Sequence, residues 1–296
     1  DNLPQHDLQC PLCIIIDKVS GVDMDITVDA DKFGKLIAKT TSEDIELLII
    51  DDVLSIKANG TYKIPLISDE EGLISFQDIK PLDDKNVQCS TKLSSVMQAY
   101  NINKSALAKT LENPALTGYY CGDTVISTDA NVITFNGFKM FDNEEPILIS
   151  AQQMQLLTLN TNEDIDVYIG KNGIQFVTED VIIDGALMEG IEDFPAKEVN
   201  AYLDEAFTSS CKVPKDLLLS VLDRLALFIE PYDKNGAYFT FGRKGINIHS
   251  KKDASTETIN YVESKDFAPF VCCVDIPMLK EQLQANPDDM VKICLL

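Results

Sequence analysis

The sequence predicts an α+β fold made of three copies of one unit, in each of which two helices pack on antiparallel sheets. The first observation is an acidic turn that runs directly into an apolar, strand-like segment. It occurs three times, as TTSEDIELLI from Thr41, NTNEDIDVYI from Asn160 and ANPDDMVKIC from Ala285. The copies are separated by roughly 120 residues, which is the length of a domain and too long for a solenoid repeat.

The second observation is that a helix-sized amphipathic segment precedes each acidic turn. These segments are predicted over 31–40, 151–159 and 276–285, and each follows a plausible N-cap residue: Asp29, Ser150 or Asp275. In the first segment, Phe33 and Leu36 lie on the apolar face. The third observation is a second class of helix, predicted over 91–111 and 214–229. Each helix is followed by alternating strands with turn signals, such as Asn59-Gly60 and Asn172-Gly173.

These elements divide the chain into predicted domains over 1–86, 87–197 and 198–296. The boundaries lie near Pro81 and after Phe194-Pro195, where proline and charged residues interrupt the periodic pattern. When each domain is compared with the helix–strands–helix–strands unit, we expect the N-terminal part of the first domain and the C-terminal strands of the third to be missing.

Composition limits the classes of function. The chain has 296 residues, a net charge of −23 and 45% hydrophobic residues, and it contains no apolar run long enough to span a membrane and no recognisable signal peptide. Eight cysteines, most of them in apolar strands, predict a reducing, intracellular compartment. Cys10 and Cys13 have CxxC spacing, but four zinc ligands cannot be assembled locally, so no metal site is predicted.

The basic residues are concentrated in the predicted helices, whereas the strands and loops are acidic. Lys32, Lys35 and Lys39 lie at i, i+3 and i+7, opposite the apolar face. A cationic surface inside an acidic body attracts phosphate without reading base sequence, although lysines also simply solvate exposed helices. The residues predicted to face DNA are Lys32, Lys35, Lys39, Lys92, Lys104, Lys109, Lys215, Arg224 and Lys280.

The sequence predicts no catalytic residue and no cofactor. It contains neither GxxxxGK[ST] nor GxGxxG, and its only histidines are His6 and His249. Acidic pairs such as Asp51-Asp52 sit in turns or point to opposite faces of a strand, which disfavours a metal-dependent enzyme. That enzyme remains an alternative, and it would depend on Asp51 or Asp52.

Three stretches carry a resemblance to a known family: LTGYYCGDTVISTDANVITF (116–135), VIIDGALMEGIEDFP (181–195), and VPKDLLLSVLDRLALF with the hairpins after it, including Glu257. Their order and spacing resemble the bacterial-type sliding clamp, the β subunit and processivity factor of a replicative DNA polymerase. The resemblance runs from about Val22 onward. It implies a crescent-shaped subunit of a closed ring, expected to be a homodimer, whose helices surround duplex DNA and which a loader opens.

The resemblance also implies a hydrophobic pocket that binds short peptides of polymerases and of the clamp loader. Matching positions are Leu116, Thr128, Ala130, Asn131, Val132 and Ile133. In the family pattern Gly, His and Arg occupy the positions of Ala130, Asn131 and Val132, so an altered peptide preference is expected.

The implied location is the cytoplasm at the nucleoid, or the host cytoplasm for a viral protein. The alternative function is an acidic structural or interaction protein, such as a DNA mimic, that does not encircle DNA. At 128–133 the alternative is an ordinary strand-to-turn junction.

Overall fold

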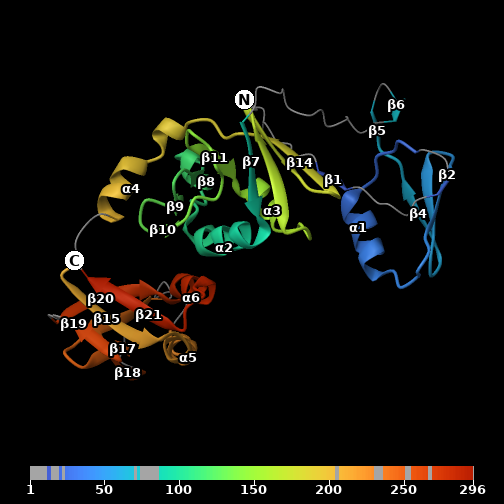
Figure 1. Ribbon diagram of the computed structural model, residues 1–296. Helices are drawn as coiled ribbons and strands as arrows, with labels where there is room; N and C mark the ends of the chain where they lie inside the picture. Colours follow the sequence, from blue (N-terminus) through green and yellow to red (C-terminus); the bar gives the residue numbers. More distant parts are fainter. Residues whose placement is uncertain are drawn as a thin grey trace. The chain divides into compact units, whose positions relative to one another are not determined.

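The computed structural model describes residues 12–14, 20–21, 24–69, 72–73, 87–203, 207–229, 236–250, 255–265 and 269–295 (Figure 1). The chain divides into two compact units, Ile15–Lys80 and Asp1–Ile14 with Pro81–Leu296. The division differs from the predicted first domain, 1–86. β1 (Leu12–Ile14) groups with the larger unit because it pairs with β14 (Val181–Ala186). The boundary at 197/198 stays a prediction.

The smaller unit is a three-stranded antiparallel sheet with one helix packed on it. Strands β2 (Glu46–Ile50), β3 (Val53–Lys57) and β4 (Thr61–Pro65) pair in that order, and β5 (Ser68–Asp69) pairs with β6 (Gly72–Leu73). Leu54, Ile56, Ile64 and Leu66 form its core, on which Phe33 and Leu36 of α1 (Ala30–Lys39) pack. The apolar helix face predicted at Phe33 and Leu36 is therefore confirmed.

Two tight turns connect these three strands. The predicted turn at Asn59-Gly60 is confirmed, since Ala58 N donates to Gly60 O at 2.9 Å. Asp51 and Asp52 form the β2–β3 turn with φ of 49° and 58°, the left-handed backbone that a two-residue hairpin of type I′ requires. Within the described parts of the chain, no group of three His, Cys, Asp or Glu side chains is arranged to hold a metal ion.

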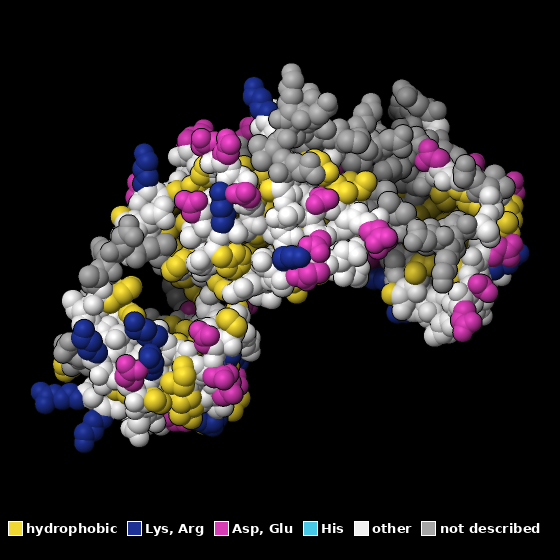
Figure 2. All heavy atoms as spheres, in the orientation of Figure 1, with side chains coloured by type: hydrophobic (Ala, Val, Ile, Leu, Met, Phe, Trp, Pro, Cys, Tyr) yellow, Lys and Arg dark blue, Asp and Glu magenta, His cyan; other side chains and the backbone are white. Residues whose placement is uncertain are grey.

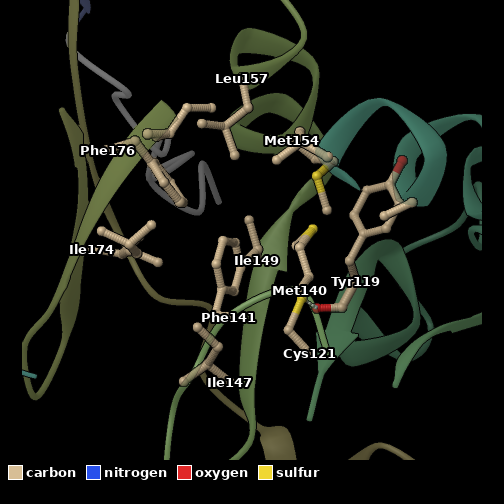
Figure 3. Close-up of a cluster of buried hydrophobic side chains, with 14 of the residues drawn as sticks. Tyr119, Cys121, Met140, Phe141, Ile147, Ile149, Met154, Leu157, Ile174 and Phe176 are labelled. Carbon is tan, nitrogen blue, oxygen red and sulfur yellow. Dashed lines mark hydrogen bonds between the residues drawn. The ribbon is translucent and has the colours of Figure 1, made fainter. Parts of the chain in front are cut away.

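The larger unit begins with two sheets that share one core. The first has the order β1-β14-β13-β12-β7, with β7 (Val87–Lys92), β12 (Asp164–Ile169) and β13 (Gly173–Val177). The second has the order β10-β9-β8-β11, with β8 (Gly118–Cys121), β9 (Val125–Thr128), β10 (Ile133–Asn136) and β11 (Ile147–Ser150). Side chains of both sheets meet those of α2 (Leu93–Asn103) and α3 (Ala151–Leu157) in this core. Figure 3 shows part of it, with Phe141 and Met140 from the loop before β11 among Tyr119, Ile149 and Met154.

The remainder of the larger unit repeats this plan. A sheet of order β19-β15-β21 consists of β19 (Glu263–Lys265), β15 (Ser209–Pro214) and β21 (Met290–Leu295). A second sheet, β18-β17-β16-β20, consists of β18 (Thr256–Asn260), β17 (Gly245–His249), β16 (Gly236–Phe241) and β20 (Phe270–Asp275). Both contribute to one core with α5 (Lys215–Ala226) and α6 (Ile276–Ala285). The helix α4 (Ala196–Leu203), which precedes β15, was not predicted from the sequence.

Three helices begin with the same local geometry, as the repeated sequence pattern predicts. The side chain of Asp29 accepts a hydrogen bond from the backbone N–H of Lys32, Ser150 accepts from Gln153, and Asp275 accepts from Met278. Each bond satisfies an amide that the first turn of a helix leaves without an intrahelical partner. The predicted N-caps of α1, α3 and α6 are thus confirmed. None of the described helices is long and apolar enough to cross a membrane.

Candidate functional site

The lysines of α1 lie on its exposed face, as the helical spacing predicts. Lys32, Lys35 and Lys39 are all exposed. Lys35 Nζ pairs with Asp31 at 2.7 Å one turn away, whereas in the described residues the ammonium groups of Lys32 and Lys39 have no carboxylate partner. An exposed pair of this kind contributes at most about 1 kcal/mol. All three ammonium groups can therefore form an ion pair with a phosphate.

The structure corrects the predicted helix over 91–111. The α-helix ends at Asn103, a 3₁₀ turn (η1, Lys104–Ala106) follows, and Leu107 is extended. Asn103 is fully buried, and its Nδ2 donates to Ala99 O at 2.9 Å and also contacts Asn136 Oδ1. An asparagine that bonds the backbone of the preceding turn competes with the helical pattern, which accounts for the early end.

The three basic residues predicted on this helix therefore lie off it. Lys92 is the last residue of β7, where its Nζ contacts Asp164, and this contact raises the pKa of Lys92. Lys104 lies in the 3₁₀ turn, with Nζ 5.2 Å from the centroid of the Tyr100 ring. Lys109 is exposed in the following turn. Of the three, Lys104 and Lys109 have no carboxylate partner among the described residues.

The basic residues of α5 and α6 all have partners. Arg224 donates from Nε and Nη2 to the two carboxylate oxygens of Glu257, which raises the pKa of Arg224 and lowers that of Glu257. Lys280 contacts Asp223, and Lys215 Nζ donates to the backbone oxygen of Asn286 at 2.9 Å. Figure 2 shows acidic and basic side chains interspersed on the visible face. The predicted cationic surface is thus partly neutralised within the chain itself.

The positions predicted to form the peptide pocket lie on and beside the β9–β10 hairpin. Thr128 and Ile133 are cross-strand partners at the end of the hairpin. The turn between them is held by side chains, since Asp129 Oδ1 accepts from the amides of Asn131 and Val132, both at 2.9 Å. Ala130 has φ of 71°, in the left-handed region that favours glycine. The turn thus keeps a glycine-type backbone although alanine occupies the position.

An apolar cluster brings Leu116 and Ile133 together. Leu116 is 7% exposed, in the 3₁₀ turn η2 (Pro114–Thr117) before β8, and Ile133 packs against the same cluster. The buried members are Ala115, Leu116, Ile126, Leu148, Phe194 and Val199, here named the Leu116 cluster. Of the six predicted positions, the structure places Leu116 and Ile133 in this cluster and buries Thr128 beside it in the sheet. Ala130 and Asn131 are exposed on the turn.

A glycine in β8 allows the chain to approach this cluster. A Cβ on Gly118 would lie 2.4 Å from Met188 Sδ and 2.8 Å from the backbone oxygen of Ile149, which no side chain could occupy without a backbone shift. Met188 N donates to Leu148 O at 3.1 Å, and its side chain packs on the Leu116 cluster. The Leu-x-Gly pattern at 116–118 therefore has a packing reason.

Sequence reasoning missed part of the cluster wall. Phe194, Val199 and the half-buried Tyr120, Met188 and Ala196 contribute to it, and Val199 and Ala196 belong to the unpredicted helix α4. The signal was present in the sequence, because Pro195 precedes apolar residues at Ala196 and Val199 with helical spacing. Prediction of a domain boundary at the same place obscured it.

Comparison with known proteins places this geometry in a known fold. No protein-family model matches the sequence, and no curated protein matches it. Among solved structures, the DNA polymerase III β subunit of Thermotoga maritima superposes with a TM-score of 0.81 at 16% identity, covering 98% of this chain and 80% of that one.

Two further solved structures agree with that match. The DNA polymerase III β subunit of Borrelia burgdorferi gives a TM-score of 0.79 at 15% identity, covering 94% of this chain and 77% of that one. The DNA polymerase sliding clamp of Bacillus subtilis gives a TM-score of 0.73 at 13% identity, with coverages of 90% and 72%. The chain therefore has the α+β fold of the bacterial DNA polymerase sliding clamps, as its repeated turns and helices predict.

Proposed function

We propose that this protein is a DNA sliding clamp, which encircles duplex DNA without reading its sequence and tethers a DNA polymerase to it. The observation that carries the proposal is the superposition of 98% of the chain on a DNA polymerase III β subunit. The proposed clamp performs no catalytic step, needs no cofactor and works in the cytoplasm at the nucleoid, or in the host cytoplasm for a viral protein.

The exposed lysines supply the proposed attraction to DNA. Lys32, Lys39, Lys104 and Lys109 have no carboxylate partner in the described part of the chain, and they are spread over separate segments. Dispersed single contacts to phosphate keep the energy almost constant along the duplex, because each is weak and independent of sequence. Sliding requires such a surface, whereas a tight binding site would stop it.

Self-association into a ring, proposed here as a homodimer, would use the exposed apolar residues that follow α5 and those on β20. Leu227 and Phe228, just after α5, are 81% and 52% exposed, and a cavity of about 300 Å³ beside them is lined by Ala226, Ile229 and Ile276. In the described residues β20 is the outer strand of its sheet, and Phe270 and Val271 are exposed on it. Unpaired strand edges and apolar patches of this kind favour association with another chain.

The β9–β10 hairpin and the Leu116 cluster are the proposed docking site for short peptides of a polymerase and of a clamp loader. Ile133 is half-buried at the cluster surface, so an apolar side chain of a peptide could cover it. The polar Asn131 and the apolar Val132 of the turn give this site a rim that differs from the family pattern. A specialised set of partners is therefore proposed.

The competing proposal is an acidic structural or interaction protein that does not encircle DNA. Its support is the pairing of Lys35, Lys92, Arg224 and Lys280 with carboxylates of the chain, together with the net charge of −23. Such a protein has no need of unpaired cations.

The experiment that separates the two proposals uses a nicked circular duplex. The full chain is loaded onto the circle at low ionic strength by a clamp loader with ATP, the salt is raised, and retained protein is measured by gel filtration before and after the circle is cut once. A sliding clamp stays on the circle at high salt, since its link is topological, and leaves after linearisation. Equal loss from circular and linear DNA at every salt concentration would refute the clamp.

A further inference from the structure

A second cavity of the larger unit lies where the β8–β9 turn, the loop before β11 and helix α4 meet. Its volume is about 670 Å³, and its wall includes Tyr120, Asp123, Asn143, Glu144 and Asn200. Asp123 and Glu144 are both exposed carboxylates, and among the described residues that line the cavity none is Lys, Arg or His. The cavity therefore presents negative charge to whatever enters it.

Tyr120 forms a fixed aromatic surface in this wall. Its ring stacks on that of Phe194, with a centroid distance of 4.8 Å and an interplanar angle of 15°. A Cβ on the neighbouring Gly122 would lie 3.1 Å from Tyr120 Cε1, so glycine at this position allows the backbone to pass close beside the ring. Burial, and after it the negative charge of Asp123, raises the pKa of Tyr120. The phenol thus stays neutral, with Asp123 close to it.

Asn143 adds a buried polar group to the wall. It is 4% exposed, and its Nδ2 donates to the backbone oxygens of Cys121 at 3.1 Å and of Glu145 at 2.6 Å. These bonds fasten the loop that carries Glu144 to the end of β8. Asn143 Oδ1 accepts no hydrogen bond from the described residues. A buried acceptor without a donor is unfavourable, but this oxygen is enclosed by the protein, and a ligand N–H would reach it only if the loop moved.

We propose that this cavity binds an arginine side chain of a partner peptide. A guanidinium is planar, stacks on aromatic rings and carries five N–H donors, which suit the ring of Tyr120 and the carboxylates of Asp123 and Glu144. Lysine would supply the charge but not the flat surface or the fork of donors. The acidic wall favours arginine over any uncharged side chain of the same shape.

Tyr120 links the cavity to the Leu116 cluster of the proposed peptide-docking site, and the identity of the ligand as a clamp partner rests on that proposed function. Tyr120 packs on the Leu116 cluster, to which Phe194 belongs and against which Ile133 packs. Leu116 and Gly122 flank β8 at its two ends, so at about 3.3 Å per residue an extended segment of about six residues spans the distance. A peptide with an apolar end at Ile133 and an arginine about six residues away would occupy both places.

The test uses N-acetyl-arginine methylamide and its neutral isostere N-acetyl-citrulline methylamide, each titrated into the isotopically labelled full chain. Amide shifts of Gly122 and Thr124 and the side-chain NH₂ signal of Asn143 are followed by NMR. We expect these signals to move with the arginine probe and not with the citrulline probe. Asp123→Asn and Glu144→Gln should each weaken binding about two- to fivefold, as neutralisation of an exposed partner does.

A matched control is Glu179→Gln in the β13–β14 turn, which removes one exposed charge outside the cavity and should leave binding of the probe unchanged. Equal shifts with the citrulline probe, or undiminished binding of the arginine probe to an Asp123→Asn, Glu144→Gln double variant, would overturn the proposal. The result is separable from the clamp proposal. Retention on circular DNA does not depend on this cavity, and failure of retention leaves binding of the arginine probe intact.

Discussion

Arg224 on α5 and Glu257 on β18 form a two-pronged ion pair, with Nε 2.8 Å from Oε1 and Nη2 2.6 Å from Oε2. Arg224 is one of the residues predicted to face DNA, and Glu257 lies in a stretch that carries the family resemblance. Together they contribute no net charge. This one pair shows how a cation on a helix can be unavailable to phosphate until its partner is removed.

Glu257→Gln should therefore increase the attraction of the protein to DNA. The amide keeps the shape of the side chain but not its charge, so Arg224 can turn to a phosphate. We expect the affinity at low ionic strength to rise and its dependence on salt to steepen by up to about one unit of slope, as one added phosphate contact requires. Fluorescence anisotropy across a salt series measures both quantities.

Glu263→Gln is the control for Glu257→Gln. It also removes a carboxylate with a basic partner, since Glu263 pairs with Lys212 at 2.7 Å. Lys212 lies on β15 and is not one of the predicted DNA contacts. If both variants raise DNA affinity equally, the change in total charge explains the effect and the role of Arg224 is lost.

Simultaneous replacement of Lys32, Lys35 and Lys39 by Gln should reduce retention on circular DNA at low salt while leaving self-association intact. Three phosphate contacts account for a loss of about three units of salt slope at most. Gel filtration on nicked circles gives the retention, and sedimentation velocity gives the state of association.

The comparison for the lysine variant replaces three exposed basic residues of turns, Lys171, Arg243 and Lys244, by Gln. It changes the net charge of the chain by the same amount. If the lysines of α1 line the surface that faces DNA, this variant should lose clearly less retention than the variant of Lys32, Lys35 and Lys39. Identical losses would show that only the total charge matters.

Ile133→Asp should weaken binding of a polymerase-derived peptide with an apolar end. A carboxylate at the surface of the Leu116 cluster must be desolvated when the peptide covers it, at a cost of several kcal/mol. Isothermal titration calorimetry measures the affinity. Leu159→Asp, at a position that is 67% exposed in the turn after α3, serves as the control. Full affinity in the Ile133→Asp variant would place the docking site elsewhere.

Ala130→Gly should stabilise the protein slightly. The left-handed backbone at φ of 71° costs a residue with a Cβ about 1–2 kcal/mol, of which the greater freedom of glycine in the unfolded chain offsets about 0.5–1 kcal/mol. We expect a net gain of up to about 1 kcal/mol in the free energy of unfolding by urea denaturation. Asp129→Ala should have the opposite sign, since it removes the acceptor of two backbone amides. A destabilised Ala130→Gly variant would contradict this account of the turn.

Phe228→Asp should weaken self-association and with it retention on circular DNA. Phe228 is 52% exposed beside the cavity of about 300 Å³, so the folded subunit loses little packing when the ring is replaced by a carboxylate. Sedimentation velocity and thermal unfolding separate loss of association from loss of folding. Val262→Asp, which also replaces an exposed apolar residue at 66%, should associate normally. An unchanged association constant for Phe228→Asp would exclude this surface from the interface.

The sequence by itself determined the repeat and most of the elements. Asp29, Ser150 and Asp275 cap helices because a side-chain oxygen before an apolar helix face satisfies the first amides, and this interaction is local. The hairpins at Asn59-Gly60 and Asn172-Gly173 also lie where the sequence predicts them, although none of these four residues has a positive φ and Asn59 exchanges side-chain hydrogen bonds with Thr41.

Only the tertiary structure decided which charges are free and which residues meet. The burial of Asn103 against Asn136 joins α2 to β10, and the pairing of Arg224 with Glu257 depends on the packing of α5 beside β18. The meeting of Leu116 with Ile133 and Phe194 likewise joins three separate segments. Such contacts join residues that are far apart in the chain. The packing of all the sheets and helices together brings these residues close, so no local pattern of residues predicts the contact.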